Sequence, residues 1–336
     1  YTGVDTLSLH DALPICKKVV YILLVLGFVL LIKGADLFVD GSSNIARALH
    51  VSPLLIGLTF VALGTSSPEA SISIIAAMEE NAGVALGNVV GSNILNTTLV
   101  VGIAAFIYPL QVENETIRKE IPFTLLASAA LLILISDIAL QGASENLLTR
   151  GDGFIILLLF SIFLYYIFEV ARNSREKIKE ENKEEKSTSW MKNILLTLGG
   201  LIGIIFGGEL VVRNATEIAL SLGMSETLTG LTIVAIGTSL PELITSITAA
   251  LKKQSDIALG NIVGSNIFNI LFVLGATASI HPIIVDNRIL FDILIMIFLT
   301  ATLLIFSRTN FKIGRFEGIF LVIAYILYMV FIIIRN

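Results

Sequence analysis

Charged residues are scarce in this chain. Asp, Glu, Lys and Arg make up 15% of its 336 residues, whereas a soluble domain usually carries about 25%. Cysteine is almost absent, because Cys16 is the only one, and this excludes internal disulfides and cysteine-rich metal centres. The sequence also lacks a His-Glu-x-x-His signature, a nucleotide-binding loop and a serine-triad motif. We therefore expect neither an enzyme nor a cofactor.

Long apolar runs dominate the composition instead. The chain is 55% hydrophobic, and apolar runs recur from Val19 to Ile334. A run of about 20 apolar residues is long enough to cross a hydrocarbon core about 30 Å thick. The predicted fold class is an all-α polytopic membrane protein. We predict ten transmembrane helices, at 18–38, 52–79, 83–108, 118–136, 153–171, 192–212, 225–252, 256–280, 287–307 and 316–334.

A polar segment divides these spans into two sets of five. Residues 172–191 are rich in Lys and Glu and poor in apolar side chains, which is typical of a solvated linker. It separates a first five-helix repeat, residues 16–171, from a second, residues 192–336. Residues 1–15 look like a translated sequencing adapter, so we predict a non-native tail. The alternative is a genuine extramembrane tail.

The two halves are copies of one another. The motif Gly-Thr-Ser-x-Pro-Glu ends at Glu69 and again at Glu242, an offset of 173 residues. The motif Gly-Asn-x-x-Gly-Ser-Asn-Ile-x-Asn ends at Asn96 and, at the same offset, at Asn269. About half of the positions in this window are identical, without a gap. Apolar composition alone does not produce such a match, so the chain contains an internal duplication.

The charge distribution predicts that the second copy is inverted. Five is an odd number, so the second copy must enter the membrane from the opposite side. When loops are assigned alternately, most Lys and Arg fall on one side, and the positive-inside rule makes that side cytoplasmic. Glu79-Glu80 in the first copy is matched by Lys252-Lys253 in the second. We predict two inverted five-helix repeats in the plasma (inner) membrane, a cytoplasmic linker, both termini extracellular or periplasmic, and a midplane substrate site.

Each copy has an interrupted span with a carboxylate beside the interruption. Pro68 and Pro241 remove a helix hydrogen bond, and the glycine upstream of each lowers the cost of unwinding. A simple proline kink is the alternative, but both copies place a glutamate next to the proline. A carboxylate near the bilayer centre costs several kcal/mol unless it is compensated, and the repeat segments supply no Lys or Arg partner. The remaining compensations are a bound cation or a proton. Two glutamates facing each other match one Ca²⁺, which takes six to eight oxygen ligands.

The following span supplies further polar groups. Ser92 and Asn96 are four residues apart and share a helical face, as their copies do. We expect the glycine pairs to allow close helix packing; they are Gly87, Gly91, Gly260 and Gly264. We favour interhelical hydrogen bonds over ion ligation for four further asparagines, Asn88, Asn93, Asn261 and Asn266.

These motifs resemble those of the sodium/calcium exchanger family of the Ca²⁺:cation antiporter superfamily, especially its prokaryotic members. The resemblance covers essentially everything after Cys16. It implies that Glu69 and Glu242 bind Ca²⁺ and Na⁺ in competition. It also implies the other ligands of this metal site: the carbonyls of Thr65 and Thr238, the side chains of Asn96 and Asn269, and flanking Na⁺ sites formed by Ser66, Ser92, Ser239, Ser265 and the backbone oxygens of Ala62 and Ala235.

Three details of the motifs bear on which ion is coupled. Some family members carry an acidic residue where Asn269 stands, so its absence weakens the case for K⁺ co-transport. Ser67 replaces a more usual leucine, a change that we expect to be tolerated. The proton-coupled branch of the superfamily typically has Gly-Asn-x-x-Glu at the first motif, so the Thr-Ser-x-Pro-Glu of this chain favours Na⁺.

We therefore expect a secondary active antiporter that moves Ca²⁺ out and Na⁺ in by alternating access, in the lipid bilayer, without nucleic acid or an obligatory protein partner. The resemblance suggests three Na⁺ per Ca²⁺ and a pair of first and sixth spans that slides against the binding core. One alternative is a Ca²⁺/H⁺ antiporter that uses the same glutamates, because buried carboxylates can carry protons. Another is a passive cation channel lined by the duplicated motifs.

Overall fold

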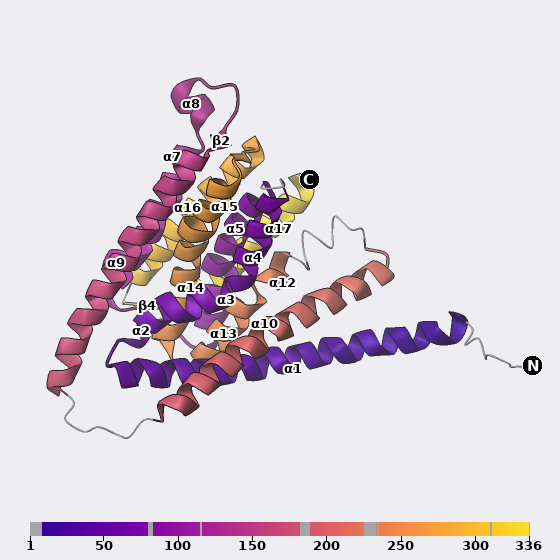
Figure 1. Ribbon diagram of the computed structural model, residues 1–336, viewed down its shortest axis with the longest axis horizontal. Helices are drawn as coiled ribbons and strands as arrows, with labels where there is room; N and C mark the ends of the chain where they lie inside the picture. Colours follow the sequence, from indigo (N-terminus) through magenta and orange to yellow (C-terminus); the bar gives the residue numbers. More distant parts are fainter. Residues whose placement is uncertain are drawn as a thin grey trace, which may run out of the picture.

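The computed structural model describes residues 9–79, 83–114, 116–181, 189–224, 233, 235–309 and 311–335. These residues are mostly helical (Figure 1). The α-helices are α1 (Leu9–Leu49), α2 (Pro53–Ile56), α3 (Ala62–Thr65), α4 (Ser67–Met78), α5 (Gly83–Leu95), α6 (Val101–Ile107), α7 (Ile121–Leu134), α8 (Asp137–Gln141), α9 (Arg150–Glu181), α10 (Trp190–Ser221), α12 (Ala235–Thr238), α13 (Leu240–Leu251), α14 (Ser255–Phe268), α15 (Gly275–Ile280), α16 (Asn287–Arg308) and α17 (Arg315–Arg335).

Short π-helical turns and two-residue strands complete the described structure. The π-helical turns are η1 (Gly57–Val61), η2 (Asn96–Val100), η3 (Thr116–Glu120) and η5 (Asn269–Leu274). The strands are β1 (Leu110–Gln111), β2 (Leu147–Leu148), β3 (Ile283–Ile284) and β4 (Lys312–Ile313). β1 pairs with β4 and β2 pairs with β3, both antiparallel, so each pair joins a loop of one half to a loop of the other.

The helices confirm a polytopic membrane protein. Within the described residues, seven helices are long and apolar enough to span a membrane, and α2–α4 adds an eighth if its two parts, bent by 48° at the break, form one span. The predicted spans at 118–136 and 225–252 coincide with η3–α7 and α12–α13, but most of 225–234 lies outside the described residues. The number ten therefore stays a prediction.

The duplicated sequence gives duplicated local structure. Adding 173 to the residue numbers converts the bounds of α3, α4 and β1 into those of α12, α13 and β3. Both η2 and η5 begin at the last asparagine of their motif copy. A π-helical turn inserts an extra residue into the hydrogen-bonding ladder and often marks a functional site. The inversion of one half relative to the other stays a prediction.

Helices α1 and α10 lie side by side across the rest of the bundle (Figure 1). Glycines make the contact: a Cβ built on Gly34 would lie 2.8 Å from the Gly200 carbonyl oxygen, and one on Gly207 would lie 2.8 Å from the Gly27 carbonyl oxygen. Small residues let two backbones approach this closely in a membrane. The α1–α10 pair is therefore packed backbone to backbone as one unit.

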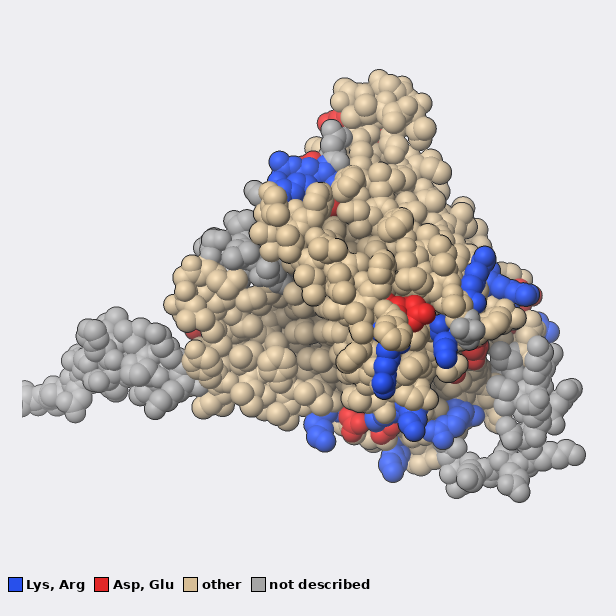
Figure 2. All heavy atoms as spheres, turned by 180° about the vertical axis from the view of Figure 1, so that it is seen from behind, with Lys and Arg blue, Asp and Glu red and all other residues tan. Residues whose placement is uncertain are grey.

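The centre of the protein is α14, whose residues from Ile257 to Phe268 are all buried. The outer helices expose large apolar side chains such as Phe168, Phe298 and Ile326, as lipid-facing surfaces do. Figure 2 shows broad uncharged surface on this face, with most of the visible Lys and Arg toward the bottom and the right flank and a smaller group on the upper left. Charge on this face is thus gathered in patches.

Two expected segment boundaries, those of the central linker and of the N-terminal tail, can be compared with the described helices. α9 continues to Glu181 and α10 begins at Trp190, so the early part of the expected 172–191 linker is helical. Residues 182–188 lie outside the described residues, as do residues 1–8 of the expected non-native tail. The backbone of α1 begins at Leu9, inside that expected tail. The origin of the tail stays a prediction.

Candidate ion-binding site

Both glutamates lie in the first turn of a helix that restarts after a break. Ser66 separates α3 from α4 with φ −82° and ψ 6°, and Ser239 separates α12 from α13 with φ −94° and ψ 11°. A proline follows in each first turn, where its missing N–H costs no helix hydrogen bond. Glu69 and Glu242 are fully buried at these N-termini, where the helix dipole favours negative charge.

Each glutamate is held by a serine of the other copy. Ser66 Oγ donates to Glu242 Oε1 at 2.7 Å, and Ser239 Oγ donates to Glu69 Oε1 at 3.1 Å. Ser92 Oγ extends the second contact, because it lies 3.0 Å from Ser239 Oγ. In the described part of the chain, neither carboxylate forms a salt bridge with Lys or Arg. The two motif copies therefore interlock around a pair of buried carboxylates.

An asparagine fixes the backbone at each glutamate. Asn88 Nδ2 donates to the Glu69 carbonyl at 3.5 Å and to a serine hydroxyl on α4 at 3.2 Å. Asn261 Nδ2 makes the same two contacts in the second copy, with the Glu242 carbonyl at 3.4 Å and the Ser246 hydroxyl at 3.0 Å. The amide nitrogen thus ties the motif helix to the broken helix in both copies.

A second layer of amides joins the two copies beside the glutamates. Asn93 Nδ2 donates to the Asn266 carbonyl at 3.1 Å, and Asn266 Nδ2 donates to Thr97 Oγ1 at 2.9 Å. Asn269 Nδ2 donates to Asn93 Oδ1 at 3.3 Å. Together with Asn88, these contacts confirm that the motif asparagines outside the expected ligand set make interhelical hydrogen bonds.

Several buried oxygens of the expected site are left without a hydrogen-bond partner among the described residues. They are Glu69 Oε2, Glu242 Oε2, Asn96 Oδ1, Asn269 Oδ1 and Ser265 Oγ. Buried polar atoms are normally paired, so a cluster of unpaired oxygens needs an explanation. Ca²⁺ is a hard cation that binds carboxylate, amide and hydroxyl oxygens. The donor set therefore fits a hard cation, with the negative charge supplied by the two glutamates.

The remaining expected ligands are backbone carbonyls of α3 and α12, and the hydrogen bonds around them differ from those of the side-chain ligands. Thr65 Oγ1 donates to Asn261 Oδ1 at 2.9 Å and to the Ala62 carbonyl at 3.3 Å. That carbonyl also accepts a backbone N–H at 3.0 Å, so both of its lone pairs are engaged in this conformation. Ala235 begins α12, and Thr238 ends it. Ion ligation by the carbonyls of these four α3 and α12 residues stays a prediction.

A cavity of about 500 Å³ reaches the site from one end of the bundle, between α5, α16 and α17. Its wall includes Ser92 and Thr238 at the site and Asp286, Arg288 and Arg335 near helix ends. It therefore joins the buried motif to a charged end of the molecule.

The glycine pairs behave differently in the two copies. A Cβ on Gly264 would lie 2.5 Å from the Leu58 carbonyl oxygen, and one on Gly260 would lie 2.6 Å from a carbonyl oxygen of α2. These two pack closely, as predicted. Gly87 and Gly91 line the cavity instead, and no described atom lies within 4 Å of a Cβ built on either. For the first copy the packing stays a prediction, because residues 225–232, which match the segment packed on Gly260 and Gly264, lie outside the described residues.

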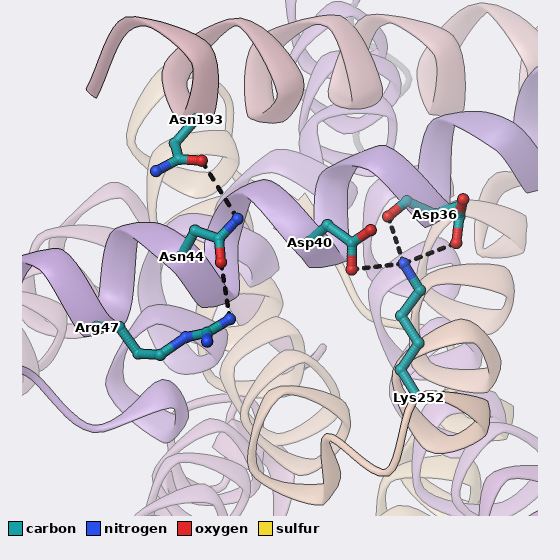
Figure 3. A network of polar contacts seen from close by, with 6 residues as sticks. All are labelled: Asp36, Asp40, Asn44, Arg47, Asn193 and Lys252. Atoms are coloured by element: carbon teal, nitrogen blue, oxygen red, sulfur yellow. Dashed lines mark hydrogen bonds and ion pairs between the residues drawn. The ribbon is translucent and has the colours of Figure 1, made fainter. Parts of the chain in front are cut away.

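Two charged contacts were not found from the sequence. Arg335 forms a bidentate pair with the buried Asp292, at 2.9 and 2.8 Å, beside the cavity. Lys252 lies between Asp36 and Asp40 of α1 (Figure 3). The four-residue spacing of the two aspartates is the only signal for the second contact, and it does not identify a partner more than 200 residues away.

Comparison with known proteins finds similarity along nearly the whole chain. The sequence model of the family described as "Sodium/calcium exchanger protein" matches residues 19–169 and 192–334. The chain is 33% identical to the sodium/calcium exchanger MaX1 of Methanosarcina acetivorans, over 92% of this chain and 97% of that protein. It is 35% identical to the inner membrane protein YrbG of Escherichia coli K12, over 91% of this chain and 94% of that one.

A solved structure is similar over nearly the whole chain. It is the sodium-calcium exchanger NCX_Mj, soaked with Na⁺ and Sr²⁺, with a TM-score of 0.79 and 34% sequence identity. The match covers 94% of this chain and 99% of that one. The similarity therefore extends to the arrangement of the helices.

Proposed function

Because the chain belongs to the sodium/calcium exchanger protein family, and is thus a cation/Ca²⁺ antiporter, we propose that it moves Ca²⁺ out of the cell in exchange for entering Na⁺. The exchange takes place at one site near the membrane midplane. The structural match NCX_Mj was soaked with Na⁺ and with Ca²⁺ or Sr²⁺, which supports these ions as substrates.

The observation that carries the proposal is the pair of interlocked carboxylates. Glu69 and Glu242 are each bonded to a serine of the other copy, and each keeps one buried oxygen unpaired within the described chain. The two carboxylates carry about two negative charges, which one Ca²⁺ neutralises. No group of three or more His, Cys, Asp or Glu that could hold a metal ion occurs among the described residues. The proposed donor set is therefore the two glutamates completed by neutral oxygens.

Competition between the ions follows from the shared ligands. Na⁺ and Ca²⁺ both need the two glutamates, so a site that holds Ca²⁺ cannot hold a full set of Na⁺. The unpaired side-chain oxygens of Asn96, Asn269 and Ser265 complete the central site, and Ser66, Ser92 and Ser239 line the flanking Na⁺ positions. With three Na⁺ per Ca²⁺, as the family resemblance suggests, one net charge enters per cycle, worth about 2.3 kcal/mol per 100 mV.

The proposed architecture is ten transmembrane helices in two inverted five-helix repeats. The matched bounds of α3 and α12, and of α4 and α13, support the duplication. The reciprocal serine–glutamate contacts support a pseudo-two-fold relation between the copies. The orientation rests on charge: the central linker is cytoplasmic and both termini are outside, because Lys and Arg concentrate on the linker side.

Access alternates between the two sides of the membrane. The cavity leads from the end with Arg288 and Arg335 to Ser92, and the proposed orientation makes that end extracellular. In the second copy, Gly260 and Gly264 pack against α2 and η1 and close the matching route. The conformation described is therefore the outward-open one, and movement of the α1–α10 pair opens the other route.

Flux measurements test the driving ion directly. Proteoliposomes loaded with Na⁺ and diluted into Na⁺-free buffer should accumulate ⁴⁵Ca²⁺, and equal internal and external Na⁺ should abolish the uptake. Uptake driven by a pH gradient without Na⁺ would refute the Na⁺ assignment and support the Ca²⁺/H⁺ alternative, which the unpaired buried carboxylates also fit. Ca²⁺ flux that needs no counter-ion would refute antiport and leave a passive channel.

A further inference from the structure

A lysine at the end of the second broken helix connects the binding core to the α1–α10 pair. Lys252 caps the C-terminus of α13, the helix that carries Glu242. Its Nζ lies 2.6 Å from Asp36 Oδ1 and 2.7 Å from Asp40 Oδ1, and it donates to the Asp36 carbonyl at 2.8 Å (Figure 3). We call Asp36, Asp40 and Lys252 the α1 latch.

This contact crosses a boundary between two bodies. α1 and α10 are packed backbone to backbone through their glycines, and Asn44 Nδ2 donates to Asn193 Oδ1 at 3.2 Å across the same interface (Figure 3). They therefore move together. Lys252 belongs to the other body, so the α1 latch must break whenever the pair slides away from the end of α13.

The duplication places a second set of charges at the matching positions. The offset of 173 carries Asp36 to Glu209, Asp40 to Arg213 and Lys252 to Glu79. The second set again has two carboxylates and one base. Its base, Arg213, is on the sliding helix α10, and the carboxylate of Glu79 is at the end of the core helix α4. We call Glu209, Arg213 and Glu79 the α10 set.

The α10 set is not engaged in this conformation. Among the described residues, no salt bridge joins Glu79 to Arg213, and both are exposed. The helices show the same asymmetry: α1 packs along α13, whereas α10 makes no comparable contact with α4 in the described part of the chain. One set is closed and its copy is open, as expected when two copies exchange roles during a transport cycle.

We propose that the two sets are alternative latches: Asp36 and Asp40 hold Lys252 in the conformation described, and Arg213 holds Glu79 in the opposite conformation. The inference rests on the proposed alternating access by two inverted copies. The reversed charges keep the two latches from substituting for one another. Asp36 and Asp40 would repel Glu79, and Arg213 would repel Lys252. Glu209 keeps the charge sign of Asp36, so the discrimination rests on the reversal from Asp40 to Arg213.

The latches set the balance between the two conformations. Side chains of the α1 latch are partly exposed, at 24% for Lys252 and 44% and 56% for the two aspartates. Pairs of this kind contribute modestly, so losing Lys252 should change the ratio of the two conformations by roughly 2- to 10-fold. Such a change alters the occupancy of each state without damaging the ion site.

A cysteine in the cavity reports the conformation without any transport measurement. Gly91 lines the cavity, and a side chain there meets no described atom within 4 Å. Gly91→Cys in a Cys16→Ser background, purified in detergent, should react with a maleimide at a rate proportional to the open fraction. Lys252→Gln should lower the open fraction and slow this labelling, by a factor no larger than the roughly 2- to 10-fold change in the ratio of the conformations, and Glu79→Gln should speed it up. The double variant should return toward the parent.

The adjacent lysine is the matched control. Lys253→Gln removes the same charge one residue away, and no salt bridge of Lys253 is found among the described residues, so its labelling rate should equal that of the parent. Equal effects of Lys252→Gln and Lys253→Gln, or no effect of either, would overturn the α1 latch. Slower labelling of Glu79→Gln would overturn the proposed latch between Arg213 and Glu79. Because labelling in detergent needs no ion gradient, a failed Na⁺-driven flux assay would refute the proposed function and not the latches.

Discussion

The sharpest test of the site compares Asn261→Ala with Asn88→Ala, the same substitution at matched positions. Asn261 is fully buried and makes three contacts, accepting from Thr65 Oγ1 at 2.9 Å and donating to Ser246 Oγ at 3.0 Å and to the Glu242 carbonyl at 3.4 Å. Asn88 is half-buried, makes two longer contacts, and lines the cavity.

The expected magnitude follows from these contacts. A buried hydrogen bond contributes about 1 kcal/mol, and a partner left unsatisfied costs about 1–3 kcal/mol. Removing Asn261 strands the Ser246 hydroxyl in a closed interior and leaves Thr65 only its longer contact with the Ala62 carbonyl, so we expect a loss of about 2–4 kcal/mol. At Asn88 the cavity admits water to the freed partners, so the loss should be about 1 kcal/mol or less.

Thermal melting in detergent, with and without Ca²⁺, measures both effects. Asn261→Ala should melt several degrees below the parent and bind Ca²⁺ at least about tenfold more weakly, because Glu242 loses its backbone anchor. Asn88→Ala should stay close to the parent in melting temperature. Equal lowering of the melting temperature by both substitutions, or unchanged Ca²⁺ affinity of Asn261→Ala, would refute the distinction between a closed and an open half.

Three further outcomes test the site, the packing and the orientation. Glu69→Gln and Glu242→Gln should each abolish Na⁺-driven ⁴⁵Ca²⁺ flux and the rise in melting temperature that Ca²⁺ gives the parent. Ca²⁺ at 100 times its dissociation constant stabilises the parent by about 2.7 kcal/mol. Normal flux in either variant would remove that residue from the site. Gly264→Ala, whose Cβ would lie 2.5 Å from a carbonyl oxygen, should cost about 1–3 kcal/mol of stability in melting experiments, whereas Gly91→Ala should be neutral. A cysteine at Asn173, within the expected 172–191 linker, in a Cys16→Ser background should resist an impermeant maleimide in intact cells and react in inside-out vesicles, and the reverse pattern would invert the topology.

Local structure around the motifs could be predicted from sequence because its causes are local. A proline lacks an N–H and fits a helix only in its first turn, so the chain breaks at Ser66 and Ser239 and restarts with Pro68 and Pro241 in the new first turns. The asparagine contacts follow from the cost of an unpaired amide in a buried helix interface. The sequence does not show that Glu69 is bonded to the serine of the other copy, because the offset alone does not determine how the copies face each other.

The differences between the copies could not be predicted at all. Gly91 and Gly264 occupy the same place in identical motifs, yet one lines the cavity and the other touches a carbonyl. Near-identical sequences have near-identical local preferences, so a difference between them comes from the conformation of the whole protein. Under the proposed alternating access, the structure describes one of two conformations, whereas a sequence motif read by itself does not distinguish them.

The latches and the orientation of the protein have the same origin under the proposed inverted arrangement. Lys252 and Glu79 are matched residues on opposite sides of the membrane, and the positive-inside rule requires the basic residue on the cytoplasmic side. Once Glu79 replaces Lys252, a sliding helix that carried two aspartates would be repelled from the outer end of the core. Glu209 keeps the negative charge of Asp36, and Arg213 in place of Asp40 offsets that charge. An inverted duplication thus forces the charge on both sides of the sliding interface to change together, and Arg213→Asp should impair transport more than Arg213→Gln, with Glu79→Lys restoring flux to Arg213→Asp.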